Sequence, residues 1–248
     1  MIQRKGVRFL TLHLAAFDHV EHSDGPYSAR AFAALEEIDK MVGQIEAALR
    51  KADPRAALCV VSDHGFAAVD HQLNLNVALV KAGLLQLNAG GTAIQDWKAQ
   101  PWSSAGSAAV ILKDPADAAT RAKLEEVLRS VAADPANGIE RVLDRNAIAA
   151  LGGTPAAAFW VDMKSNYALG AALTGPLVRE ISRRGTHGFA PTHPDLQASF
   201  FVVAPGVRKG YDLGAIDMRS FAPTFARLLG IDFPGADLPP LPAFEGVK

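Results

Sequence analysis

The order of apolar and polar positions predicts strands alternating with an amphipathic helix near the N-terminus. Val7 to Leu14 (VRFLTLHL) is β-branched and apolar enough for a buried strand, and Ala57 to Ser62 (ALCVVS) is a second short apolar run. Between them, residues 29–52 place apolar side chains at steps of three and four, which predicts a helix with Ser28 as its N-cap. A strand, a helix and a second buried strand predict a βαβ unit with parallel strands.

The middle of the chain has a different pattern. From about residue 88 the sequence becomes rich in Gly, Ala and Pro, and we expect an inserted α+β subdomain over residues 88–175. Its predicted elements are a strand at Ser107 to Leu112, a helix over Ala116 to Ala133 and a strand at Ala158 to Met163. A short helix over Asn76 to Leu85 is predicted to precede it.

The apolar strand pattern returns after the insert. Ala198 to Ala204 (ASFFVVA) predicts another buried strand, and Met218 to Leu229 predicts a final helix with Pro223 near its first turn. The expected fold class is therefore α/β, with a mainly parallel sheet flanked by helices. Residues 1–87 and 176–248 are expected to form its core, and residues 88–175 a small inserted subdomain.

Composition and net charge exclude only a few classes of function. The 248 residues are 49% hydrophobic and 21% charged, which is typical of a globular chain, and one cysteine excludes an intrachain disulfide. A formal net charge of −1 gives no signal for nucleic-acid binding. We identify neither a signal peptide nor a run of the roughly 18 apolar residues that a membrane helix needs. Localisation and oligomeric state stay open.

Three polar clusters stand out against this pattern. Asp18 and His22 lie four residues apart in FDHVEHSDGP, Asp63 and His64 form the centre of SDHG, and His187 lies in GTHG. The first two clusters follow predicted strands, and open α/β sheets build their sites at the carboxyl ends of strands. Two carboxylates and three imidazoles that converge there would suit one or two zinc ions.

Each cluster has an ordinary structural explanation when it is taken alone. An Asp-His pair in a loop is more often a cap or turn, and charged residues four apart are common on solvated helix faces. Glu21 and Asp24, in the first cluster, are expected to be solvated, or at best to support the ligands from behind. The hypothesis of a metal site therefore depends on the coincidence of all three clusters in one chain.

The same motifs resemble a known family. The order Asp-x3-His-x2-Gly-Pro, SDHG and GTHG, followed by PDLQASFFVVAPGV, is similar to the type I phosphodiesterase/nucleotide pyrophosphatase family of the alkaline phosphatase superfamily. The closing stretch IDMRSFAPTFARLLGI resembles its last helix. The resemblance implies an alkaline-phosphatase-like fold and zinc-dependent hydrolysis of phosphodiester or pyrophosphate bonds in a small, nucleotide-like substrate.

Carried over residue by residue, the resemblance implies two zinc sites. Asp18, His22 and His187 would be the protein ligands of one, and Asp63 with His64 would supply part of the other. In the family an aspartate and a threonine or serine nucleophile, well before the Asp-x3-His motif, complete the second site. Only 17 residues precede Asp18. We therefore expect one complete zinc site and a nucleophile outside this chain, with the catalytic residues unassigned.

Other functions fit the same motifs. One alternative is another hydrolase of the alkaline phosphatase superfamily, such as a phosphomonoesterase or phosphonate hydrolase. The other is a metal-binding domain without catalytic activity.

Overall fold

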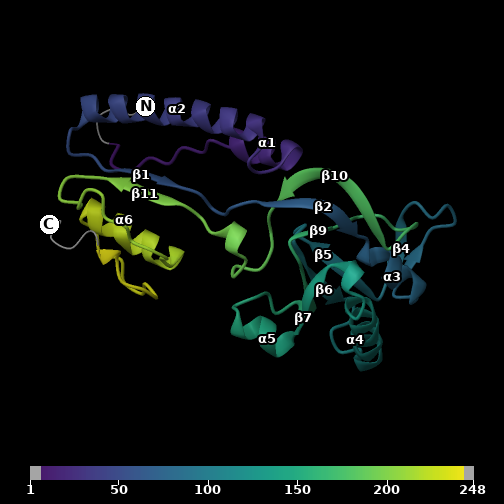
Figure 1. The fold of residues 1–248 in the computed structure, drawn as a ribbon. Helices are drawn as coiled ribbons and strands as arrows, with labels where there is room; N and C mark the ends of the chain where they lie inside the picture. Colours follow the sequence, from purple (N-terminus) through teal and green to yellow (C-terminus); the bar gives the residue numbers. More distant parts are fainter. Residues whose placement is uncertain (1–6, 243–248) are drawn as a thin grey trace. The chain divides into compact units, whose positions relative to one another are not determined.

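The computed structural model describes residues 7–242, which separate into two compact units (Figure 1). The first unit takes in the chain up to Ala15, then Ala33–Asp63, and the chain from Ala198 onward. The second unit takes in Ala16–Phe32 and His64–Gln197. Each unit is described by itself.

The helices and strands follow one another in a mixed order along the chain. The helices are α1 (Ala16–Asp24), α2 (Ala29–Ala52), α3 (Leu75–Lys81), α4 (Ala118–Ala132), α5 (Arg145–Ala150) and α6 (Phe221–Leu229), with 3-10 turns at Pro135–Asn137, Pro194–Leu196 and Met218–Ser220. The strands are β1 (Leu58–Val61), β2 (Ala67–Leu73), β3 (Leu85–Leu87), β4 (Ile94–Trp97), β5 (Ala99–Ser103), β6 (Ser107–Leu112), β7 (Ile139–Asp144), β8 (Ala157–Met163), β9 (Asn166–Leu169), β10 (Val178–Thr186) and β11 (Phe200–Val203).

The first unit contains a two-stranded antiparallel sheet of β1 and β11, with Val60 opposite Phe201. Because side chains alternate along a strand, β11 presents Phe200 to one face and Phe201 to the other. The ring of Phe200 packs on Phe221 of α6, with centroids 4.6 Å apart. Phe201 is 65% exposed and Val203 54% exposed. One face of this sheet is therefore covered by aromatic packing, whereas the other presents apolar side chains to solvent.

The second unit is built on two larger sheets. In the first, β2 lies between β10, its antiparallel neighbour, and β9, its parallel neighbour, and α1 packs against β10. The second sheet has the order β5-β6-β8-β7, with every pair antiparallel, and α4 packs against β7 (Figure 1). A separate pair joins β3 and β4. The largest fully buried side chains are Val69, Leu73, Leu75, Leu79, Leu84, Val110, Leu124, Leu128, Val161 and Met163.

The prediction of a mainly parallel sheet is wrong. Within residues 7–242 the only parallel pair is β2 with β9, and β1 pairs with β11 in the antiparallel sense. The strand predicted at Val7 to Leu14 is also absent, since that segment has no hydrogen-bonded partner strand in the described part. Its Phe9 and Leu12 are more than half exposed. An apolar run shows that a segment prefers burial, but it does not specify the partner or its direction.

Most other predicted elements are confirmed. The helix over residues 29–52 is α2, and the Ser28 hydroxyl accepts a hydrogen bond from the N–H of Ala31 at 3.1 Å, as an N-cap does. The predicted strands at 57–62, 107–112, 158–163 and 198–204 correspond to β1, β6, β8 and β11. The helices over 116–133 and 218–229 correspond to α4 and to α6 with its preceding 3-10 turn. The helix predicted over 76–85 ends earlier, at Lys81, and the insert boundaries at 88 and 175 stay predictions.

Candidate metal centre

Helix α1 carries the first two donors on one face. Asp18 and His22 are one turn apart, and an Asp18 carboxylate oxygen lies 3.7 Å from Nε2 of His22. The other ring nitrogen, Nδ1 of His22, lies 3.3 Å from the carbonyl oxygen of Gly185. A proton on Nδ1 would be donated to that carbonyl, which leaves the Nε2 lone pair directed at the Asp18 side. This arrangement, in which a backbone oxygen fixes the tautomer, is typical of metal-ligating histidines.

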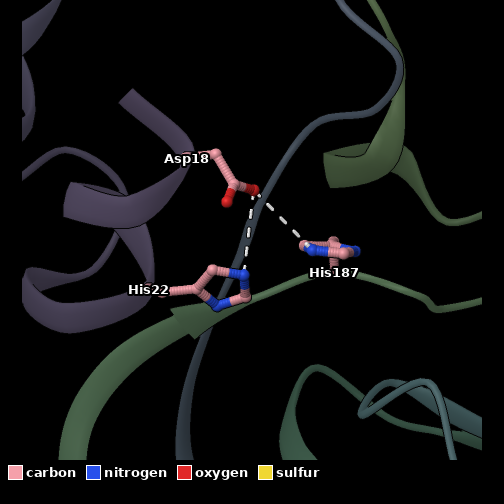
Figure 2. Close-up of side chains that lie close together, drawn as sticks. All are labelled: Asp18, His22 and His187. Atoms are coloured by element: carbon pink, nitrogen blue, oxygen red, sulfur yellow. Dashed lines mark ion pairs between the residues drawn. The ribbon is translucent and has the colours of Figure 1, made fainter. Parts of the chain in front are cut away.

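The third donor comes from the end of β10. Nε2 of His187 lies 3.7 Å from the same Asp18 oxygen, so the carboxylate stands between two imidazoles (Figure 2). One ligand atom from each residue lies within 4.8 Å of the others. Ligand atoms about 2.1 Å from a tetrahedral zinc ion are about 3.4 Å apart, so the two 3.7 Å separations would close by about 0.3 Å and the widest separation by up to about 1.4 Å. The donor set, one carboxylate and two imidazoles, is one that zinc accepts.

A glycine permits the close approach of α1 to β10. A Cβ at position 185 would lie 2.4 Å from the Glu21 carbonyl oxygen, 2.8 Å from the Phe66 ring and 2.9 Å from Pro26. Only glycine therefore lets the strand pass against the helix without displacing it. The result is that His187, two residues further along, reaches the face of α1 that carries Asp18 and His22.

Two residues that follow β1 in the chain pack on these imidazoles. The ring of His64 stacks on that of His187, with centroids 3.8 Å apart and an interplanar angle of 20°. The Phe66 ring meets His22 and His187 edge to face at 4.8 and 5.3 Å. Nδ1 of His64 lies 3.0 Å from the carbonyl oxygen of Gly65, which leaves Nε2 as its acceptor atom. Three imidazoles thus gather around one buried phenyl ring.

The expectation that Glu21 is solvated is wrong. Its residue is 9% exposed, and it lies on α1 between the two donors of that helix. Burial, with a smaller contribution from the Asp18 carboxylate, raises the pKa of Glu21 from 4.5 to about 6, while His64 opposes the rise. In the sequence, Glu21 follows Asp18 by three residues, and this spacing indicates that the two side chains share a helix face. Asp24, by contrast, is a partly exposed partner of Arg30 at 2.9 Å.

The structure therefore places the five predicted ligands unequally. Asp18, His22 and His187 converge, and His64 lies against His187. Asp63 is the last residue of the first unit and is exposed. Sequence reasoning missed Phe66 and Glu21, which pack beside the ligands without being ligand candidates themselves.

The sequence places this chain in a known family. The profile of the family described as type I phosphodiesterase / nucleotide pyrophosphatase matches residues 2–190, most of the chain. The chain belongs to this family, as its motifs suggested. A comparison with curated proteins found no match.

Solved structures of ectonucleotide pyrophosphatase / phosphodiesterase 5 have a similar fold. The human protein is 18% identical, with a TM-score of 0.63 over 87% of this chain and 52% of that one. An inactive variant of the murine protein in complex with AMP is 17% identical, with a TM-score of 0.64 over 90% and 53%. This chain thus spans about half the length of these relatives. The likeness supports a mixed, alkaline-phosphatase-like α/β fold.

Proposed function

We propose that this chain forms the metal-binding part of a zinc-dependent hydrolase of phosphodiester or pyrophosphate bonds. The observation that carries the proposal is the convergence of Asp18, His22 and His187 on one point from two elements distant in sequence. Family membership supplies the reaction class.

Each residue of the centre has a distinct proposed role. Asp18, His22 and His187 would hold one ion, and Asp63 with His64 would contribute to a second. Bound zinc supplies Lewis-acid stabilisation of a phosphoryl oxygen and lowers the pKa of a bound water. The Gly185 carbonyl keeps His22 in the tautomer that leaves Nε2 available. The Phe66 ring excludes water from one side of the imidazoles.

The proposed substrate is a small phosphodiester or nucleotide-like molecule. The complex of the murine relative with AMP supports this substrate class. The protein has a net charge of −1, so local charge or bound metal, rather than a broad basic surface, would have to attract an anionic phosphate. Among residues 7–242, no helix is both long and apolar enough to cross a bilayer.

The decisive experiment measures zinc bound to the purified chain. We expect about one tightly bound zinc per chain, reduced at least tenfold in affinity in His187→Ala and His22→Ala. His71→Ala is the matched control, since His71 is a histidine of the same unit on β2 that pairs with Asp70 at 2.6 Å and is not one of the three candidate ligands. Zinc binding that is equal in His187→Ala and the wild-type chain would overturn the assignment.

A second measurement concerns the reaction. Hydrolysis of bis(p-nitrophenyl) phosphate, with and without chelator, is compared with hydrolysis of p-nitrophenyl phosphate. We expect slow, chelator-sensitive turnover with preference for the diester, because no hydroxyl nucleophile is assigned in this chain. Preference for the monoester would favour the phosphomonoesterase alternative, and zinc binding without any turnover would fit both a non-catalytic domain and a nucleophile outside this chain.

A further inference from the structure

The backbone of the His187 loop is held by a strand of the other sheet of the same unit. The N–H of Gly106 donates to the carbonyl oxygen of His187 at 3.0 Å. Next to it, the Ser107 hydroxyl, which is on a residue only 1% exposed, donates to the carbonyl oxygen of Gly188 at 2.5 Å. The start of β6 thus fixes two successive peptide groups of the segment that carries the proposed ligand.

The turn after His187 is made at a glycine with a left-handed backbone. Gly188 has φ of +81°, and a Cβ there would lie 1.9 Å from the carbonyl oxygen of Ser104. Both the conformation and the close contact therefore require glycine. The path of the backbone after His187 therefore depends on this packing of Gly188 against residues 104–107.

A buried carboxylate holds the far side of the same loop. Asp162 on β8 is 4% exposed, and its Oδ1 accepts a hydrogen bond from the N–H of Ala190 at 3.0 Å. Its Oδ2 lies 3.2 Å from Nε of Arg141 on β7, and Arg141 also reaches the Thr192 hydroxyl at 3.5 Å. A buried carboxylate is costly unless it is paired and hydrogen-bonded, and both conditions are met here.

We propose that Asp162 is a positioning residue for the metal centre, which acts by anchoring the Gly188–Thr192 loop so that His187 faces Asp18 and His22. The inference rests on the proposed metal site. It gives the predicted inserted subdomain a role in metal binding, because the anchoring residues lie on its strands β6, β7 and β8. Asp162 is not a ligand, since its two oxygens are used by Ala190 and Arg141.

The test compares three variants in the full chain. Asp162→Ala removes both interactions, and we expect zinc affinity to fall at least tenfold, in the range seen when partners of metal ligands are removed. Asp162→Asn keeps the acceptor for Ala190, and we expect affinity within about threefold of wild type. Leu128→Ala, a fully buried residue of α4, destabilises the same unit without touching the loop and should leave affinity unchanged.

Two further readouts separate positioning from general destabilisation. The visible absorption of Co²⁺ substituted for zinc reports ligand geometry, and we expect it to change in Asp162→Ala but not in Leu128→Ala. In the metal-free protein, amide exchange at Ala190 should quicken in Asp162→Ala relative to the amides of β6. If Ala190 exchanges equally fast in Asp162→Ala and in the wild-type chain, and the His187 ring resonances are the same in both, the proposal is overturned. This outcome can be read even if the wild-type chain binds no zinc. Absence of zinc from the wild-type chain would instead overturn the proposed function.

Discussion

At the residue scale, Phe66 is the side chain that contacts most of the proposed ligands. Its ring centroid lies 4.8 to 5.8 Å from those of His22, His64 and His187. It is 7% exposed, so it shields the imidazoles from water on that side. Packing around ligands controls both their orientation and the access of solvent.

We therefore expect Phe66→Leu to weaken zinc binding several-fold, because leucine fills less of the space and cannot hold the rings edge to face. Zinc titration with a competing chelator dye measures the change. Phe159→Leu is the matched control, because Phe159 on β8 is equally buried, at 6% exposed. If both variants weaken binding equally, the effect belongs to the core and not to the ring contacts.

Glu21 predicts a pH dependence of stability in the metal-free chain. Its pKa is about 6 in the folded protein against 4.5 ordinarily, so the folded state holds the proton more tightly. Below pH 4.5 both states are protonated and the residue contributes nothing. Between about pH 4.5 and 6 only the unfolded state releases the proton, so the folded state loses stability, and the loss is complete above pH 6. A shift of this size corresponds to about 2 kcal/mol, which solvent screening reduces to about 1 kcal/mol.

The corresponding variant is Glu21→Gln, measured by urea unfolding in the presence of chelator. We expect its free energy of unfolding to exceed that of the wild type above pH 6, and the difference to disappear below pH 4.5. Glu125→Gln, on the exposed side of α4, is the matched substitution at a solvated position. A wild-type chain that gains stability relative to Glu21→Gln as pH rises would contradict the sign of this effect.

The sequence specified the candidate ligands better than their surroundings. Asp18 and His22 could be paired from their spacing, because a helix has a fixed period. Phe66 and Asp162 act through contacts between segments distant in the chain, and no local pattern encodes such contacts, whereas the spacing of Glu21 from Asp18 on one helix was a local signal. In the sequence AFWVDM, Asp162 has the pattern of an ordinary polar position in an alternating strand, and nothing there indicates that its carboxylate is buried.

At the scale of elements, the packing of α1 on β10 determines whether the ligands meet. Gly185→Ala would put a methyl group 2.4 Å from the Glu21 carbonyl oxygen, which is too close for any Cβ. We expect α1 to move away from β10, with zinc affinity reduced at least tenfold and the second unit destabilised by about 1–3 kcal/mol. Chelator competition and urea unfolding measure the two effects.

Gly43→Ala is the contrasting control for this prediction. Gly43 lies within α2 and a Cβ there meets nothing within 4 Å. Alanine should therefore stabilise the helix by up to about 1 kcal/mol and leave zinc binding unchanged. Wild-type zinc affinity in Gly185→Ala would show that α1 can shift without separating the ligands.

Helices were predicted more accurately than the pairing of strands, for a physical reason. A helix such as α2 satisfies its hydrogen bonds within one segment, so its apolar stripe and its Ser28 cap are local signals. A strand such as β1 depends on a partner about 140 residues later in the chain. Its run of LCVV is compatible with either direction of pairing, and the parallel interpretation followed from an expected βαβ unit that does not form.

At the scale of the whole molecule, the first unit exposes apolar side chains on one face of its two-stranded sheet. Phe201 on β11 stands opposite Val60 on β1, and the two residues are 65% and 36% exposed. A short apolar sheet with an exposed face and unpaired edges is prone to associate with other chains.

We expect Phe201→Lys to reduce concentration-dependent association of the purified chain, measured by sedimentation velocity. Phe200→Lys is the matched control on the opposite face, where it would disrupt packing on Phe221 and destabilise the first unit instead. Association that is unaffected by Phe201→Lys would show that this face does not mediate the association.

The spread of the metal donors along the chain has a consequence for biosynthesis. Asp18 and His187 are separated by about 170 residues, which a ribosome adds in roughly 10 to 30 seconds. During that interval α1 can offer only Asp18 and His22, and a pair of donors holds zinc weakly. The third donor arrives together with the strands that anchor its loop. In the proposed site, metal capture would therefore be one of the last events in the maturation of the second unit, and zinc scarcity would act on newly finished chains before it acts on old ones.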